Sequence, residues 1–170
     1  NDIDTLVTFG KETDTKKKLE LLGGKINDIT YCGSIRMEHA LSNFKKIDEI
    51  DQIDILLIGI NLANWVGTSK EIINIYYKHF EWVSEISKKY PKLNILIKHH
   101  PNYKLDNRER KIIKETNIKT IINPVNDLNS YHFLFKSNLI LSFGSTMILE
   151  GLGAGKNCFY LDPGAKNTTF

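Results

Sequence analysis

The amino-acid sequence predicts an α/β protein, built as a Rossmann-like parallel sheet with helices on both faces. Short apolar runs typical of strands alternate with longer amphipathic stretches, and one of these runs, at 53–60, is almost wholly aliphatic. The stretch at 69–90 has the periodicity of a helix that is apolar on one face. Strands that alternate with helices favour parallel βαβ units, in which ligands bind beyond the carboxyl ends of the strands.

The first 46 residues are predicted to hold a small set of elements. These are strands at 5–9 and 28–35, a helix at 13–24 that ends on two glycines, and a helix that begins near Met37. An acidic connector follows at 45–54. We place a domain boundary in this region, which gives domains at 1–46 and 47–170.

The larger domain begins with the run IDILLIGI at 53–60, which suits a central parallel strand covered on both faces. Apolar side chains then recur every three or four residues between Ile72 and Tyr90, which predicts a long crossover helix. The remaining elements continue the alternation: strands at 93–98, 118–122, 138–142 and 157–161, and helices at 107–115, 127–135 and 145–152.

Two histidines and a proline end the predicted strand at 93–98, in the order Lys98, His99, His100 and Pro101. Adjacent residues at a strand end point in opposite directions, and the proline restricts the backbone, so one ring is held toward the cleft. A histidine placed there can donate a hydrogen bond to a phosphate oxygen. We predict that His100 does so and that His99 turns inward, with His99 and Lys98 as further candidates. The alternative is that one histidine packs and the other is solvated.

A second candidate phosphate site is the sequence SFGST, residues 142–146, at the end of another predicted strand. Gly144 allows a close approach of the backbone, while Ser142, Ser145 and Thr146 supply hydroxyl groups. The amides at the start of the following helix would add positive partial charge. The alternative is a tight turn into a packed helix. The sequence contains neither a Walker A motif nor a dinucleotide-binding glycine motif in the required position.

Glu150 is the third candidate. It is not the partner of a capping box, because Met147 and not serine or threonine stands three residues before it. A carboxylate one turn inside a phosphate-binding helix can accept hydrogen bonds from ribose hydroxyls. The alternative is a solvated surface carboxylate, and both interpretations stay open.

Composition and charge exclude several other classes of protein. The net charge of +3 comes from scattered basic residues, which does not indicate a nucleic-acid-binding protein. No HExxH motif is present, and we expect no metal requirement and no cofactor. The longest apolar run has six residues, so membrane contact is expected to be peripheral at most. The two cysteines lie far apart without a CxxC motif, which favours a reduced cytoplasmic location.

The order of three segments is similar to that of a known group of enzymes. The segments are GSIRMEHAL, then ILIKHHP, then the stretch from NPVNDLNSYHF through SFGSTMILEGLGAGK to NCFYLDPG. This order resembles the donor-nucleotide half of GT-B-fold enzymes that build bacterial surface and capsular polysaccharides. These are transferases that use CMP-linked sugars and CDP-glycerol glycerophosphotransferases, with UDP-N-acetylglucosamine 2-epimerases as more distant relatives. The resemblance covers roughly residues 31–163.

The resemblance implies roles for individual residues. His100 with Pro101 would match the family's histidine–proline motif, and Ser145 with Thr146 its serine pair on the donor phosphate. Glu150 would bind the ribose, and the backbone at Val125 would lie against the base. The turn is S-F-G-S-T and not an acidic D-S-G-G or D-Y-S-S, which argues against an epimerase.

The resemblance also implies a function and a domain organisation. Residues 1–46 would be the end of an amino-terminal acceptor domain with its hinge, and 47–170 the donor-binding domain, incomplete at its carboxyl end. The expected function is transfer of a sugar or glycerophosphate unit from a CMP-, CDP- or UDP-linked donor to a glycan acceptor, in the cytoplasm or at the inner face of the membrane. A UDP-sugar 2-epimerase and a non-catalytic nucleotide-binding module are the alternatives.

We expect the isolated chain to bind nucleotide without transferring sugar. A general base must lie within hydrogen-bond reach of the hydroxyl that it activates. Asp162 comes closest to that role, but the sequence LDPG is typical of a turn after the last strand. The base is therefore expected in the amino-terminal domain.

Overall fold

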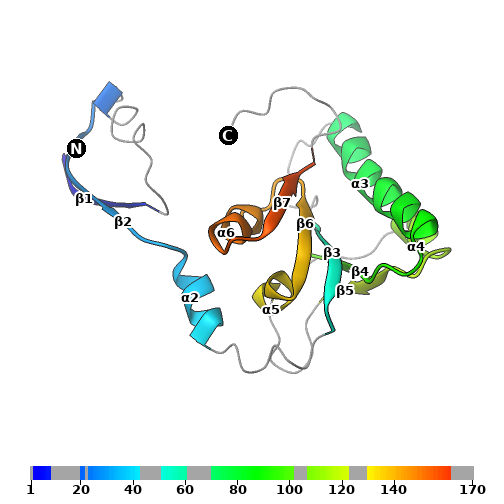
Figure 1. Ribbon diagram of the computed structural model, residues 1–170. Coiled ribbons are helices and arrows are strands. Elements are labelled where there is room, and N and C mark those ends of the chain that lie inside the picture. Colours follow the sequence, from blue (N-terminus) through cyan, green and yellow to red (C-terminus); the bar gives the residue numbers. More distant parts are fainter. Residues whose placement is uncertain are drawn as a thin grey trace. The chain divides into compact units, whose positions relative to one another are not determined.

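The computed structural model describes residues 2–8, 20–21, 23–42, 51–60, 70–101, 107–122 and 130–161. They belong to two compact units, Asn1–Phe44 and Lys45–Phe170. The elements of both units are labelled in Figure 1. The division after Phe44 lies close to the boundary placed after residue 46, while the roles of acceptor and donor domain stay predictions.

The smaller unit contains a pair of parallel strands, β1 (Asp2–Thr8) and β2 (Lys25–Tyr31), followed by helix α2 (Ile35–Ser42). The strand predicted at 28–35 is thus shorter than expected at its carboxyl end. The reason is Ser34, whose Oγ accepts a hydrogen bond from the Met37 amide at 3.2 Å and so caps the start of α2. Of the helix predicted at 13–24, only residues 20, 21, 23 and 24 lie within the described part of the chain.

The larger unit is built on five parallel strands in the order β5-β4-β3-β6-β7. This confirms the predicted Rossmann-like α/β fold. The chain moves outward from β3 through β4 to β5, and then crosses to the other side of β3 to form β6 and β7. The strands are β3 (Ile53–Ile58), β4 (Ile95–Lys98), β5 (Lys119–Ile121), β6 (Ser137–Ser142) and β7 (Asn157–Tyr160).

Helices cover both faces of this sheet, with α3 and α4 on one face and α5 and α6 on the other (Figure 1). The helices are α3 (Lys70–Lys89), α4 (Asn107–Ile113), α5 (Ser130–Phe135) and α6 (Met147–Gly153). Each overlaps its predicted range. α6 begins two residues later than predicted, because Thr146 is its N-cap residue.

The core of the larger unit lies between β3 and α3. Ile55 and Leu57 of β3 point to the same face and pack in one cluster with Tyr76, Phe80 and Val83 of α3. The three helix residues are spaced by four and three positions, so they form a single apolar stripe. All but one residue of β3 are buried, as expected for a central strand that is covered on both faces.

On the opposite face, Gly151 brings α6 close to the sheet. A Cβ atom at this position would lie 2.9 Å from Cys158 Sγ and 3.0 Å from Ile140 Cδ1, whereas a Cβ atom at Gly153 would meet nothing within 4 Å. We expect Gly151→Ala to be less stable than Gly153→Ala by about 1–3 kcal/mol, because only the first overpacks the core. Gly153→Ala should gain up to about 1 kcal/mol from helix propensity. Urea unfolding of both variants measures the difference, and equal stabilities would contradict it.

Candidate functional site

The candidate site lies at the carboxyl ends of β3, β4 and β6. The strand order reverses at β3, since the chain continues to β4 on one side and later returns to β6 on the other. In open parallel sheets such a switch point leaves a crevice outside the carboxyl ends of the strands, where ligands bind. Both predicted phosphate-binding sequences follow strands that are direct neighbours of β3.

The strand register brings the two sequences into line. Ile58 is paired with Lys98 of β4 and with Ser142 of β6, so these three residues form one row across the sheet. The Gly59 amide donates a hydrogen bond to the Lys98 carbonyl oxygen at 2.9 Å, which extends the pairing by one position. The next residues of the neighbouring strands, His99 and Phe143, therefore flank Gly59. Two strand spacings, about 10 Å, separate their backbones.

Lys98 forms hydrogen bonds that link the ends of β4 and β5. Its side chain is buried, and Nζ donates hydrogen bonds to the His99 carbonyl oxygen and, at 2.9 Å, to that of Ile122. Burial lowers the pKa of the Lys98 ammonium group. Because this group already bonds carbonyl oxygens inside the protein, the geometry gives no support to Lys98 as a phosphate ligand.

His99 points into the protein. Its side chain is 1% exposed, and its ring stacks on Phe80 of α3 at a centroid distance of 5.9 Å and an interplanar angle of 11°. A side chain at Gly59 would meet this ring, since a Cβ atom there would lie 3.4 Å from Nδ1. Burial, and secondarily the charge of Lys98, lower the pKa of His99 to about 4. The inward orientation predicted for His99 agrees with this burial.

His100 and Pro101 continue past the edge of the sheet. His100 is half-buried and Pro101 is exposed. His100 therefore lies at the carboxyl end of β4 with part of its surface open to solvent, as its predicted role requires. Contact between this ring and a phosphate stays a prediction.

The hydroxyl group of Ser142 is not open to solvent. Its side chain is fully buried, and Oγ donates a hydrogen bond to the Ile58 carbonyl oxygen at 3.1 Å, so it joins β6 to β3. The geometry gives no support to Ser142 as a phosphate ligand.

The turn from β6 into α6 contains the other predicted phosphate contacts. Gly144 has φ of 76°, a conformation that favours glycine. Ser145 Oγ accepts a hydrogen bond from the Met147 amide at 3.3 Å, and the Ser145 carbonyl oxygen accepts one from the Ile148 amide at 3.2 Å. These two amides, which were expected to add positive partial charge at the helix start, thus already have partners within the turn. Thr146 is exposed, and its side chain makes no capping hydrogen bond.

Glu150 is not the solvated carboxylate that was one interpretation of the sequence. It is half-buried, and its Oε1 accepts a hydrogen bond from the hydroxyl of Tyr131 in α5 at 3.1 Å. Glu150 thus has a defined orientation at the flank of α6. Its contact with ribose stays a prediction.

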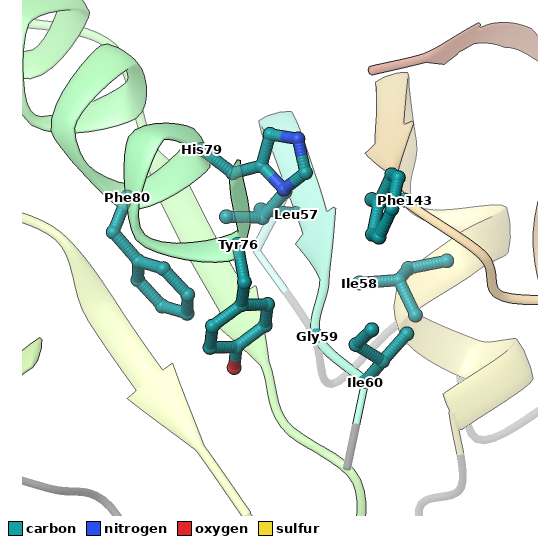
Figure 2. A pocket seen from close by; sticks show the side chains of 8 residues that line it. All are labelled: Leu57, Ile58, Gly59, Ile60, Tyr76, His79, Phe80 and Phe143. Carbon is teal, nitrogen blue, oxygen red and sulfur yellow. The ribbon is translucent and has the colours of Figure 1, made fainter. Parts of the chain in front are cut away.

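A small hollow opens beside these strand ends, between β3, β6 and the first half of α3 (Figure 2). The rings of His79 and Phe143 lie 5.2 Å apart. The empty volume of the hollow is about 190 Å³, and part of this is open solvent. The hollow is therefore smaller than pockets that hold nucleotide-sized ligands. A nucleotide would therefore lie outside it, over the strand ends. The hollow is lined by Leu57, Ile58, Gly59, Ile60, Tyr76, His79, Phe80 and Phe143.

Three residues near the site were not foreseen from the sequence. Gly59 could have been found, because a glycine directly after the first strand of a Rossmann-like unit lets the neighbouring chain approach. His79 shares the buried stripe of α3 with Tyr76 and Val83, although a helical wheel alone does not distinguish a buried histidine from a solvated one. Tyr131 gave no signal, since its contact with Glu150 joins two helices.

Two predicted residues cannot be placed. Val125 and Asp162 lie outside the described residues. Among the residues that are described, no three histidine, cysteine, aspartate or glutamate side chains gather in a way that could hold a metal ion. Within the same part of the chain, no helix combines the length and the apolar character needed to cross a membrane.

Comparison with known proteins does not assign the chain to a family: no protein-family model matches it, and no curated protein does. Its function must therefore be inferred from the sequence motifs and from the geometry of the strand ends.

Proposed function

We propose that this chain forms the donor-binding part of a glycosyltransferase, or of a related glycerophosphate transferase, that uses a nucleotide-activated donor. The observation that carries the proposal is the position of the two motifs. The sequences at 98–101 and 142–146 end the two strands that flank β3, at the point where the strand order reverses. Rossmann-like sheets bind nucleotides in this crevice.

The chemistry of the residues beyond the strand ends fits a phosphate group. His100 has an imidazole that can donate a hydrogen bond, and the exposed Thr146 has a hydroxyl group that can do the same. Such donors would stabilise the negative charge that develops on a departing nucleotide. Glu150, farther along α6, supplies acceptor oxygens suited to sugar hydroxyls.

We expect a pyrimidine nucleotide to raise the melting temperature of the chain, because a ligand that binds only the folded state stabilises it. His100→Ala, and the double change Ser145→Ala with Thr146→Ala, should each weaken nucleotide binding about tenfold or more, since hydrogen bonds to charged groups contribute about 1.5–3 kcal/mol. The measurement is a thermal-shift panel of CMP, CDP, UDP and GDP, followed by calorimetric titration of the best ligand.

Lys114→Ala is the matched control. Lys114 is exposed and directly follows α4, at the opposite edge of the sheet, so this variant should bind like the wild type. Wild-type affinity in both site variants would refute the site assignment, and no thermal shift with any of the four nucleotides would refute the proposed function. Epimer formation from a UDP-linked N-acetylhexosamine without an acceptor would instead identify an epimerase.

A further inference from the structure

We infer that Tyr131 is a positioning residue, whose hydroxyl holds the Glu150 carboxylate in place to bind the ribose hydroxyls and so makes the site selective for ribonucleotides. This role rests on the proposed function, because it requires a nucleotide at the strand ends. It is carried by one contact between two helices.

Tyr131 and Glu150 meet across the α5/α6 boundary. The Tyr131 hydroxyl donates a hydrogen bond to Glu150 Oε1 at 3.1 Å, although the two residues are 19 positions apart in the chain. Both are half-buried. The contact is therefore formed by the tertiary fold and is partly shielded from water, which strengthens it relative to a surface contact.

Glu150 lies near the edge of the sheet where the candidate site is found. It is the fourth residue of α6, about 4.5 Å along the axis from the first, so it stands one helical turn from the turn that contains Ser145 and Thr146. Tyr131 reaches Glu150 from the side away from that turn, because α5 ends at Phe135, two residues before β6 begins. Tyr131 can therefore hold the carboxylate without itself lying at the strand ends.

The burial pattern of α6 shows which way Glu150 points. Ile148 and Gly151 are buried against the sheet, whereas Leu149 and Leu152 are 60% and 53% exposed. Glu150 lies between these two faces, on the flank that Tyr131 reaches. Without a partner a glutamate side chain samples many rotamers, and fixing it costs free energy when a ligand binds. A hydrogen bond made before binding removes part of that cost.

The chemistry of the pair selects for hydroxyl groups. A carboxylate accepts hydrogen bonds and donates none, so Glu150 suits ligand groups that donate. The 2′ and 3′ hydroxyls of a ribose are two adjacent donors that suit one carboxylate. A dideoxyribose offers neither, and would leave a half-buried, oriented carboxylate without the hydrogen bonds that it makes to the ribose.

The test compares CDP with 2′,3′-dideoxy-CDP by calorimetric titration of the full 170-residue chain. We expect the wild type to bind CDP about tenfold or more tightly than the dideoxy form. Tyr131→Phe keeps the ring and removes only the hydroxyl. It should weaken CDP binding about threefold to tenfold while dideoxy-CDP binding stays within about twofold, so that the preference falls. Glu150→Gln should lower the same preference, and adding Tyr131→Phe to it should change little.

Tyr90→Phe is the matched control, because it removes the same group from a half-exposed residue just after α3, at the other edge of the sheet. It should keep the wild-type preference. A purely structural tie between α5 and α6 would lower the melting temperature of Tyr131→Phe and leave the preference unchanged, which would overturn the inference. CDP binding without any preference for ribose in the wild type would overturn it as well, and would leave the proposed function standing. No binding of either nucleotide, nor of CMP, UDP or GDP, would remove both.

Discussion

Phe80→Ala is expected to lower the free energy of unfolding by about 3–5 kcal/mol, the usual cost of removing a large aromatic side chain from a packed core. Phe80 is 1% exposed and lies between two other rings, that of Tyr76 at 5.0 Å and that of His99 at 5.9 Å. It also forms part of the wall of the hollow in Figure 2. Alanine would leave a cavity that α3 and β4 cannot close, because both are held by the surrounding cluster. Urea denaturation followed by circular dichroism measures the loss.

The matched control for this variant is Trp82→Ala, on the same helix. Trp82 is 41% exposed, so its removal should cost clearly less, about 1 kcal/mol or less. A loss below about 1.5 kcal/mol for Phe80→Ala, or equal losses for the two variants, would show that this part of the core is loosely packed.

The fold class could be predicted because the signals that define it are local. Tyr76, Phe80 and Val83 mark the buried stripe of α3 by their spacing alone, and the aliphatic run at 53–60 marks a strand covered on both faces. Element ends were less predictable. The extended segment at 28–35 ends early because a single side chain, that of Ser34, caps the next helix.

The candidate site was predictable only in part, because a sequence gives the residues but not the contacts that already occupy them. Lys98 and Ser142 stand at the expected strand ends, yet both bond carbonyl oxygens inside the protein. A pattern of residue types cannot tell these arrangements from ligand contacts, since both need the same donors. The Tyr131–Glu150 contact depends on how α5 and α6 lie against each other, which no short motif encodes.

The two adjacent histidines at the end of β4 show what the sequence could predict and what it could not. Alternation at a strand end predicts that neighbouring side chains point in opposite directions, and His99 does point inward. The sequence did not show that the ring of His99 would stack on Phe80 and lie beside Gly59, which follows the neighbouring strand β3. A Cβ atom at Gly59 would lie 3.4 Å from Nδ1 of this imidazole, so the end of β3 and the end of β4 pack closely under the candidate site.

This burial predicts a pH-dependent stability. His99 has a pKa of about 4 in the folded protein, because burial and then the charge of Lys98 disfavour its protonated form, whereas an unfolded histidine titrates near 6.5. Between these values the unfolded state binds the additional proton. The free energy of unfolding should therefore be at its full value above about pH 6.5 and fall as the pH decreases toward 4, by about 3 kcal/mol in all from this residue. About 2 kcal/mol of that loss should occur between pH 7.5 and pH 5.

His99→Phe isolates this contribution, because it keeps a flat ring on Phe80 but has no group that titrates. Its absolute stability can differ from that of the wild type for reasons of packing, so the quantity to compare is the change in free energy of unfolding from pH 7.5 to pH 5. Within this window most carboxylates stay ionised in both states. We expect the wild type to lose about 2 kcal/mol more than His99→Phe. Parallel curves for the two proteins would mean that the imidazole takes up its proton without unfolding, and that the end of β4 opens to water far more readily than its burial indicates.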